Sequence, residues 1–78
     1  MNSLYTILDR VAEECGPLFE SVNDGVALRN FKNLLDKVPP YQKSEYRLYK
    51  VGAFDTKTMG MTVLPTPEEV ILPEAGNA

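Results

Sequence analysis

NDGVALRNFKNLLDKV, residues 23–38, carries the clearest structural pattern in this 78-residue chain. Its apolar side chains recur at the spacing of one helix face, at Ala27, Phe31, Leu34, Leu35 and Val38. The polar side chains fall on the opposite face, at Arg29, Lys32, Asn33 and Asp36. The spacing therefore predicts an amphipathic helix whose apolar stripe needs a second layer to cover it.

Both ends of this helix are marked by residues that favour helix termini. Asn23 or Asp24 can cap the start, because a short side-chain oxygen accepts a hydrogen bond from the first backbone N–H groups. Pro39 and Pro40 prevent the helix from continuing. We expect a helix of about four turns.

The segment before the helix favours a β-hairpin. Residues 4–8 read as a strand with Tyr5 and Ile7 on one face, and residues 18–22 alternate in the same way. Between them, RVAEEC (residues 10–15) contains good helix formers and Gly16-Pro17 breaks the chain. We expect two strands joined by a wide, partly helical loop; the alternative is an N-terminal helix from Ser3.

The segment after the helix favours a second hairpin. Residues 39–43 read as a loop, residues 45–54 as the best strand of the chain, residues 55–60 as a turn and residues 61–64 as the partner strand. Strict alternation puts Tyr46, Leu48 and Phe54 on one face of residues 45–54 and Tyr49, Val51 and Ala53 on the other. Gly52 suggests a bulge or a close backbone approach. Pro65 should end the partner strand, and TPEE (residues 66–69) has the form of a helix start of one turn at most.

The predicted fold class is therefore α+β: a small antiparallel sheet of two hairpins with one central helix, in the order β-β-α-β-β. Residues 1–72 form a single domain in this prediction, and residues 73–78 form a flexible acidic tail. A domain of this size buries little apolar surface, so we expect a homodimer, in which a partner covers more of it.

Composition argues against an enzyme, a metal site and a cofactor site. The chain has no His, one Cys (Cys15) and no glycine-rich phosphate loop, and its paired acids, Glu13-Glu14 and Glu68-Glu69, read as solvated surface. No apolar run approaches the roughly 18 residues of a membrane span, and no leader follows Met1, so we expect a soluble intracellular protein.

Charge is unevenly distributed along the chain. Residues 1–28 have one basic and five acidic side chains, a net charge of −4. Residues 29–57 have seven basic and three acidic side chains, a net charge of +4. Residues 58–78 have three acidic side chains and no basic one, a net charge of −3. A polyanion would therefore meet a polarised molecule with a basic middle segment.

Within that segment, basic side chains interleave with tyrosines over residues 41–50. Single-stranded nucleic acid offers phosphates to basic side chains and bases to aromatic rings. The candidate nucleic-acid-binding residues are Lys43, Arg47, Tyr49 and Lys50, with Arg29 and Lys32 on the helix. The alternative interpretation is an ordinary strand with half-buried tyrosines beside a solvated helix face.

Three blocks of sequence carry a family resemblance: DRVA with GPLF (residues 9–19), NDGVALRNF (residues 23–31) and YRLYKVGAFD (residues 46–55). In their order and spacing they resemble the small nonstructural protein of gokushovirus-type microviruses, tailless phages with circular single-stranded DNA. The resemblance spans roughly residues 5–64. It departs at Leu18, where the family often has another proline, and the tail after Pro65 is not part of it.

The resemblance implies a noncapsid protein of the host bacterial cytoplasm that acts in viral single-stranded DNA synthesis or the switch toward packaging. No catalytic residues are carried over from the family. We therefore expect it to bind single-stranded DNA with little sequence preference, while the acidic tail competes for the same surface. The alternative is an interaction protein that binds a viral replication or procapsid protein, or a host replication factor; the net charge of −3 favours this reading.

Overall fold

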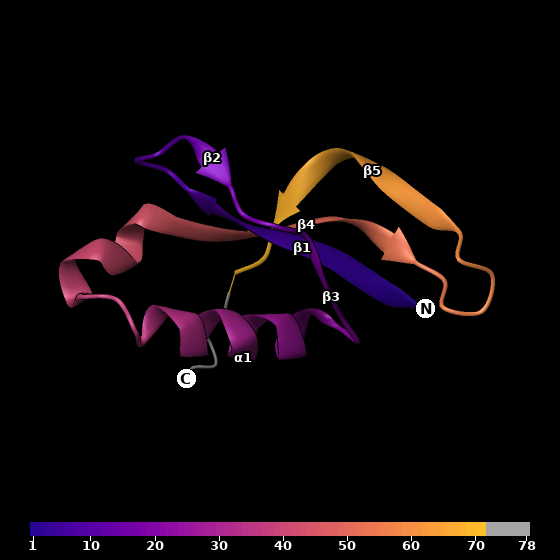
Figure 1. Ribbon diagram of the computed structural model, residues 1–78, viewed down its shortest axis with the longest axis horizontal. Helices are drawn as coiled ribbons and strands as arrows, with labels where there is room; N and C mark the ends of the chain where they lie inside the picture. Colours follow the sequence, from indigo (N-terminus) through magenta and orange to yellow (C-terminus); the bar gives the residue numbers. More distant parts are fainter. Residues whose placement is uncertain (72–78) are drawn as a thin grey trace.

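The computed structural model describes residues 1–71 and consists of an antiparallel sheet with one α-helix packed across one face (Figure 1). The elements are β1 (Asn2–Asp9), β2 (Glu14–Cys15), β3 (Phe19–Ser21), α1 (Asp24–Leu35), the 3₁₀ helix η1 (Pro40–Glu45), β4 (Tyr46–Phe54) and β5 (Met61–Glu69). The strand order is β2-β1-β4-β5, and β3 pairs with β1 on the same edge as β2. The predicted α+β class is confirmed. The predicted tail, residues 73–78, lies outside the described residues.

The connection after β1 is tighter than the sequence suggested. The expected hairpin is confirmed, because β1 pairs antiparallel with β3. The connection between these strands contains a short turn at residues 10–13 and strand β2, so the expected helical part of the loop and the alternative N-terminal helix are both wrong. The Asp9 carboxylate accepts hydrogen bonds from the Val11 and Ala12 backbone N–H groups, at 3.0 and 3.1 Å, and Glu13 adopts a positive φ of 60°. The Asp9 side chain therefore stabilises this turn, a contribution that the helix propensity of residues 10–15 does not indicate. Gly16 and Pro17 then separate β2 from β3.

Helix α1 begins where the capping signal placed it. The Asn23 side chain accepts a hydrogen bond from the Val26 N–H at 2.9 Å, and the helix ends at Leu35, one turn before the prolines. The predicted stripe needs one correction: Leu28 is buried, with 8% of its surface exposed, whereas Leu34 is 41% exposed. The chain after the helix forms η1, where the sequence suggested a loop.

Strand β4 contains a bulge at Val51. Lys50 pairs with Tyr5 and Gly52 pairs with Leu4, so Val51 has no opposite residue on β1, and the register with β5 shifts at the same place. Gly52 satisfies the predicted close approach, because a Cβ built there would lie 2.2 Å from the Thr62 carbonyl oxygen. The bulge also reverses the alternation beyond it. Phe54 therefore does not share a face with Tyr46 and Leu48, as strict alternation had predicted.

The sequence predicted that the last strand ends at Pro65 and that a helical turn follows, and this prediction is wrong. Strand β5 continues through Pro65 and Pro67 to Glu69. Its pairing with β4 falls in two blocks, residues 61–63 and 68–69, and both prolines lie between them. Proline is tolerated there because an edge strand outside the paired blocks needs no donor toward its neighbour.

The core is small and lies between the sheet and α1. It consists of Tyr5, Ala27, Leu28 and Leu48, with the Phe19 ring stacked on Tyr5 at a centroid distance of 5.8 Å. We call the side of the sheet that meets these helix residues the helix face, and the opposite side the outer face.

Candidate nucleic-acid interface

The predicted binding residues of β4 divide between the two faces of the sheet. Lys50 pairs with Tyr5, whose side chain is in the core, so Lys50 lies on the helix face. Arg47 and Tyr49 alternate with it and lie on the outer face. The strand therefore does not present all three residues as one platform.

Lys50 belongs to a network at the start of α1. Its ammonium lies 3.5 Å from the Asp24 carboxylate, and the same carboxylate oxygen accepts a hydrogen bond from the Tyr5 hydroxyl at 2.6 Å. Burial and this bond to Asp24 raise the pKa of Tyr5 to about 12. The arrangement ties the sheet to the helix N-terminus, so a structural role accounts for Lys50.

Arg47 is also held by neighbouring groups. Its guanidinium donates to the backbone carbonyls of Ser44 and Tyr46, at 2.7 and 3.0 Å, and lies 3.4 Å from the Glu69 carboxylate. An anion could reach Arg47 only in competition with Glu69. Tyr49 is half-buried, so its ring has limited surface for stacking.

Three of the six predicted residues nevertheless meet in one groove. Lys32 from α1, Lys43 from η1 and Arg47 from β4 line a groove of about 360 Å³, together with Glu69 from β5. The apolar and aromatic lining comes from Leu28, Phe31, Leu35, Tyr46, Leu48, Val70 and Ile71. We call this the basic groove. The sequence places Phe31 on the apolar stripe of the helix and Tyr46 on one face of its strand. Spacing alone could not show that both side chains remain partly exposed and line the same groove.

The segment beside the basic groove has a net positive charge, whereas the rest of the chain has a net negative charge. Residues 29–43, which comprise most of α1 and the start of η1, contain four basic side chains and one carboxylate, a net of +3. The rest of the chain contains four basic and ten acidic side chains, a net of −6. Within residues 1–71, Arg29 and Lys37 are exposed and have no carboxylate within 4.0 Å.

Two further side chains of this surface are accessible. Lys43 lies 3.8 Å from Asp36, but both side chains are well exposed, so water screens the pair and a phosphate can replace the carboxylate. Tyr41 on η1 is 74% exposed and offers an open aromatic ring beside these cations. Tyr41 belongs to the stretch of interleaved tyrosines and basic side chains, residues 41–50, but was not among the candidate binding residues.

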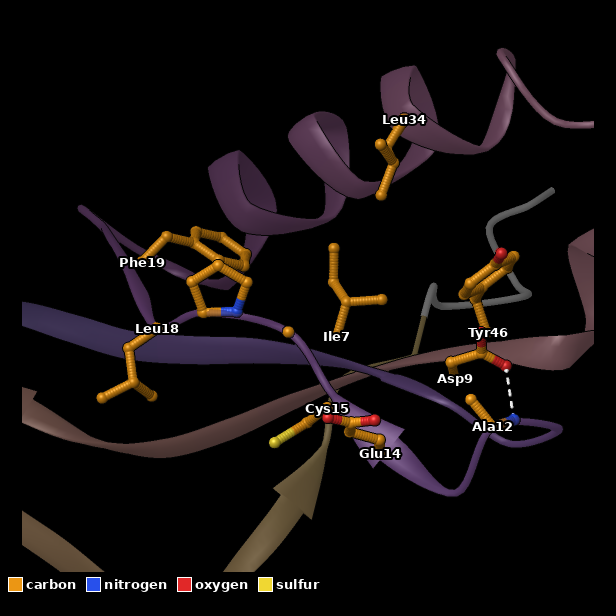
Figure 2. A pocket seen from close by; sticks show the side chains of 11 residues that line it. Ile7, Asp9, Ala12, Glu14, Cys15, Leu18, Phe19, Leu34 and Tyr46 are labelled. Atoms are coloured by element: carbon orange, nitrogen blue, oxygen red, sulfur yellow. Dashed lines mark hydrogen bonds between the residues drawn. The ribbon is translucent and has the colours of Figure 1, made fainter.

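A second, larger cavity has the opposite character. It measures about 550 Å³ and lies between α1 and the β1–β2–β3 edge of the sheet. Figure 2 shows Ile7 and Tyr46 pointing from the sheet toward α1, and Leu34 pointing from α1 toward the sheet. The charged side chains of its lining are the carboxylates Asp9 and Glu14. An apolar cavity with an acidic rim would repel phosphate.

The described residues contain no group of three or more His, Cys, Asp or Glu side chains that could hold a metal ion. Over the same residues, no helix combines the length and the apolar character that crossing a bilayer requires.

Comparison with known proteins places the chain in a family. The family model described as Phage ORF5 protein matches residues 2–77, almost the whole chain. The chain belongs to this family. It is therefore a phage protein, as the resemblance implied. Neither a curated protein nor a solved structure matches it.

Proposed function

We propose that this phage protein binds single-stranded DNA, with little sequence preference, through the basic groove and the adjoining solvent-exposed surface of α1 and η1. The supporting observation is that Lys32, Lys43 and Arg47, from three separate elements, meet around an apolar and aromatic groove. The resemblance to microvirus proteins adds the biological setting: viral single-stranded DNA synthesis, or the switch toward packaging, in the host bacterial cytoplasm.

The proposed contacts follow from the chemistry of the groove. Phosphates pair with Lys32 and Lys43, and Arg29 and Lys37 extend the path along the helix surface. A base enters the groove against Phe31 or stacks on the exposed ring of Tyr41, an interaction worth about 1–3 kcal/mol per base. The donors are charged groups on flexible stems, which bind phosphate without reading base edges.

The role of the β4 residues differs from the sequence expectation. Arg47 contributes at the edge of the groove by exchanging Glu69 for a phosphate, while Lys50 and Tyr49 contribute little. The proposal thus keeps Arg29, Lys32, Lys43 and Arg47 and moves the stacking surface from Tyr49 to Tyr41 and Phe31.

Fluorescence anisotropy with a labelled single-stranded oligonucleotide tests the proposal. With the five proposed phosphate contacts, the slope of log K against log salt should be about −3.5, so the affinity falls about 130-fold between 50 and 200 mM salt. A Lys32→Ala/Lys43→Ala variant retains about three contacts, so its slope should be about −2 and its affinity should fall about 18-fold over the same range.

The matched control is Arg10→Ala/Lys57→Ala, which removes the same total charge from exposed turns away from the groove. This variant should keep the steeper slope. An equal loss of DNA affinity in both double variants would show that only the net charge of the protein matters, and would contradict the proposed binding surface. Absence of binding by the unaltered protein in low salt would contradict the function itself.

The acidic-rimmed cavity of Figure 2 supports a second candidate function, binding of a viral replication or procapsid protein or a host replication factor. Leu34 is accessible in this cavity, so Leu34→Glu should abolish such a contact without unfolding the core. A pull-down from infected, nuclease-treated cells distinguishes the two functions. A protein contact survives the nuclease and is lost in the Leu34→Glu variant, whereas a DNA-bridged association disappears with the DNA.

A further inference from the structure

Strand β5 forms an exposed edge of the sheet (Figure 1). Its first part is uncharged and largely apolar. Met61, Thr62 and Val63 are exposed, with Val63 at 76%, and residues 58–67 contain no charged side chain. Sheet edges in monomeric proteins are usually protected by charges, prolines or bulges. The first part of β5 has none of these, although Pro65 and Pro67 protect its later part.

The backbone hydrogen bonds show which groups of this edge face outward. The Asp55 N–H donates to the Gly60 carbonyl at 2.9 Å, and pairing with β4 continues as Phe54 with Met61 and Ala53 with Thr62. In an antiparallel ladder, hydrogen-bonded and non-hydrogen-bonded pairs alternate. The Thr62 backbone therefore bonds to β4, while the N–H and C=O groups of Met61 and Val63 point away from the sheet.

We propose that β5 pairs antiparallel with β5 of a second copy of this chain, about a two-fold axis at Thr62. In this register Met61 of each copy lies opposite Val63 of the other, and each such pair exchanges two backbone hydrogen bonds. Their side chains lie on the same sheet face, so apolar surface is buried between them. The result is one continuous sheet across two subunits.

Self-pairing fits this edge better than other strands do. An isologous contact needs a surface that is complementary to itself, and an uncharged strand brings no like charges together at the axis. Antiparallel pairing also directs the Lys57 turn of one copy toward the Glu68 end of the other. Within residues 1–71, neither side chain has an oppositely charged group within 4.0 Å. The opposite edge of the sheet is divided by Gly16 and Pro17 into strands of two and three residues, and so offers no comparable template.

The two-fold axis would stand perpendicular to the sheet, so both α1 helices would cover the same side of the dimer. The two basic grooves would then face the same strand of DNA and gain affinity by avidity. This consequence rests on the proposed function, whereas the pairing of the β5 strands does not.

Light scattering after size-exclusion chromatography tests the pairing without DNA. The unaltered protein should have the mass of a dimer, and Val63→Lys should have the mass of a monomer, because it places a charge at the paired edge. Val11→Lys makes the same change at a residue that is 70% exposed in the β1–β2 turn, and should remain dimeric. Circular dichroism should show an unchanged fold for both variants. A monomeric unaltered protein, or a dimer that survives Val63→Lys, would overturn the proposal.

Cross-linking tests the register directly. Two residues at position 62 would form a non-hydrogen-bonded pair with Cα atoms about 4.5 Å apart, a separation that a disulfide spans. A Thr62→Cys variant in a Cys15→Ser background should therefore form a covalent dimer under mild oxidation, while Val11→Cys in the same background should not. Equal cross-linking of both variants, or none at position 62, would refute this register. Loss of DNA binding in a protein that still cross-links would contradict the proposed function alone.

Discussion

Replacement of Gly52 by alanine tests the bulge that shapes the sheet. The added Cβ would lie 2.2 Å from the Thr62 carbonyl oxygen, whereas ordinary contact begins at 3.4 Å, so the two strands must separate by about 1.2 Å. Overpacking of this kind costs about 1–3 kcal/mol, and weakening the neighbouring hydrogen bond between β4 and β5 adds about 1 kcal/mol. We expect Gly52→Ala to lower the free energy of unfolding by about 3 kcal/mol.

Thermal unfolding followed by circular dichroism measures the effect. For a domain of this size, 1 kcal/mol corresponds to about 4–8 °C, so the Tm should fall by about 12–24 °C. The control is Gly25→Ala in the first turn of α1, where the added Cβ would meet its nearest atom, Asn23 Oδ1, at 3.4 Å. Because alanine favours helix over glycine by up to about 1 kcal/mol, this variant should unfold at the same temperature or slightly higher.

A Gly52→Ala variant with the Tm of the unaltered protein would refute the close approach of β4 and β5. Equal destabilisation by Gly25→Ala would show that loss of glycine in general, and not contact with Thr62, is responsible. A large drop in Tm that occurs only in Gly52→Ala would show that stability depends on the close approach of β4 and β5 at this position.

Three further predictions concern the core and the start of the helix. Tyr5→Phe removes the donor to Asp24 and should lower the free energy of unfolding by about 2 kcal/mol in urea titrations. The folded state raises the pKa of Tyr5 from 10.0 to about 12, so it holds the phenolic proton more tightly than the unfolded state does. The unaltered protein should therefore lose stability as the pH rises from 10 toward 12. Tyr5→Phe has no phenolic proton and should lack this part of the loss. Leu48→Ala, at a side chain only 1% exposed, should cost about 2–5 kcal/mol in the same titrations. Asn23→Ala removes the cap on the Val26 N–H and should cost about 1 kcal/mol, measured by thermal unfolding.

Local signals in the sequence were reliable where a single element satisfies them. The cap at Asn23, the exposed polar face of α1 and the alternation of Tyr5 with its neighbours depend on groups a few residues apart. The requirement for a close approach at Gly52 was also visible, because glycine in a good strand is unfavourable unless the space is needed.

Predictions failed where a distant segment changes the local preference. Residues 66–69 have the form of a helix start, yet Glu68 and Glu69 pair with β4 and extend β5. The gain from pairing to a strand already in place exceeds that of a single helical turn, which is costly to nucleate. The bulge at Val51 similarly reverses the sheet faces beyond it, so Phe54 could not be placed by strict alternation.

The candidate site shows the same division. The sequence identified a basic segment and its cations, but a strand pattern cannot reveal that Lys50 would meet Asp24 or that Arg47 would meet Glu69. Only packing of α1, η1 and β4 brings Lys32, Lys43 and Arg47 into one groove.

The sequence by itself determined the α+β class, the capped central helix and the separation of charge along the chain, because periodicity, caps and turns act over short distances. The tertiary structure decided the register of β4 and β5, the side of the sheet on which each basic residue lies, and the edge left unpaired. These features depend on contacts between residues far apart in the chain, and the pairing register sets them.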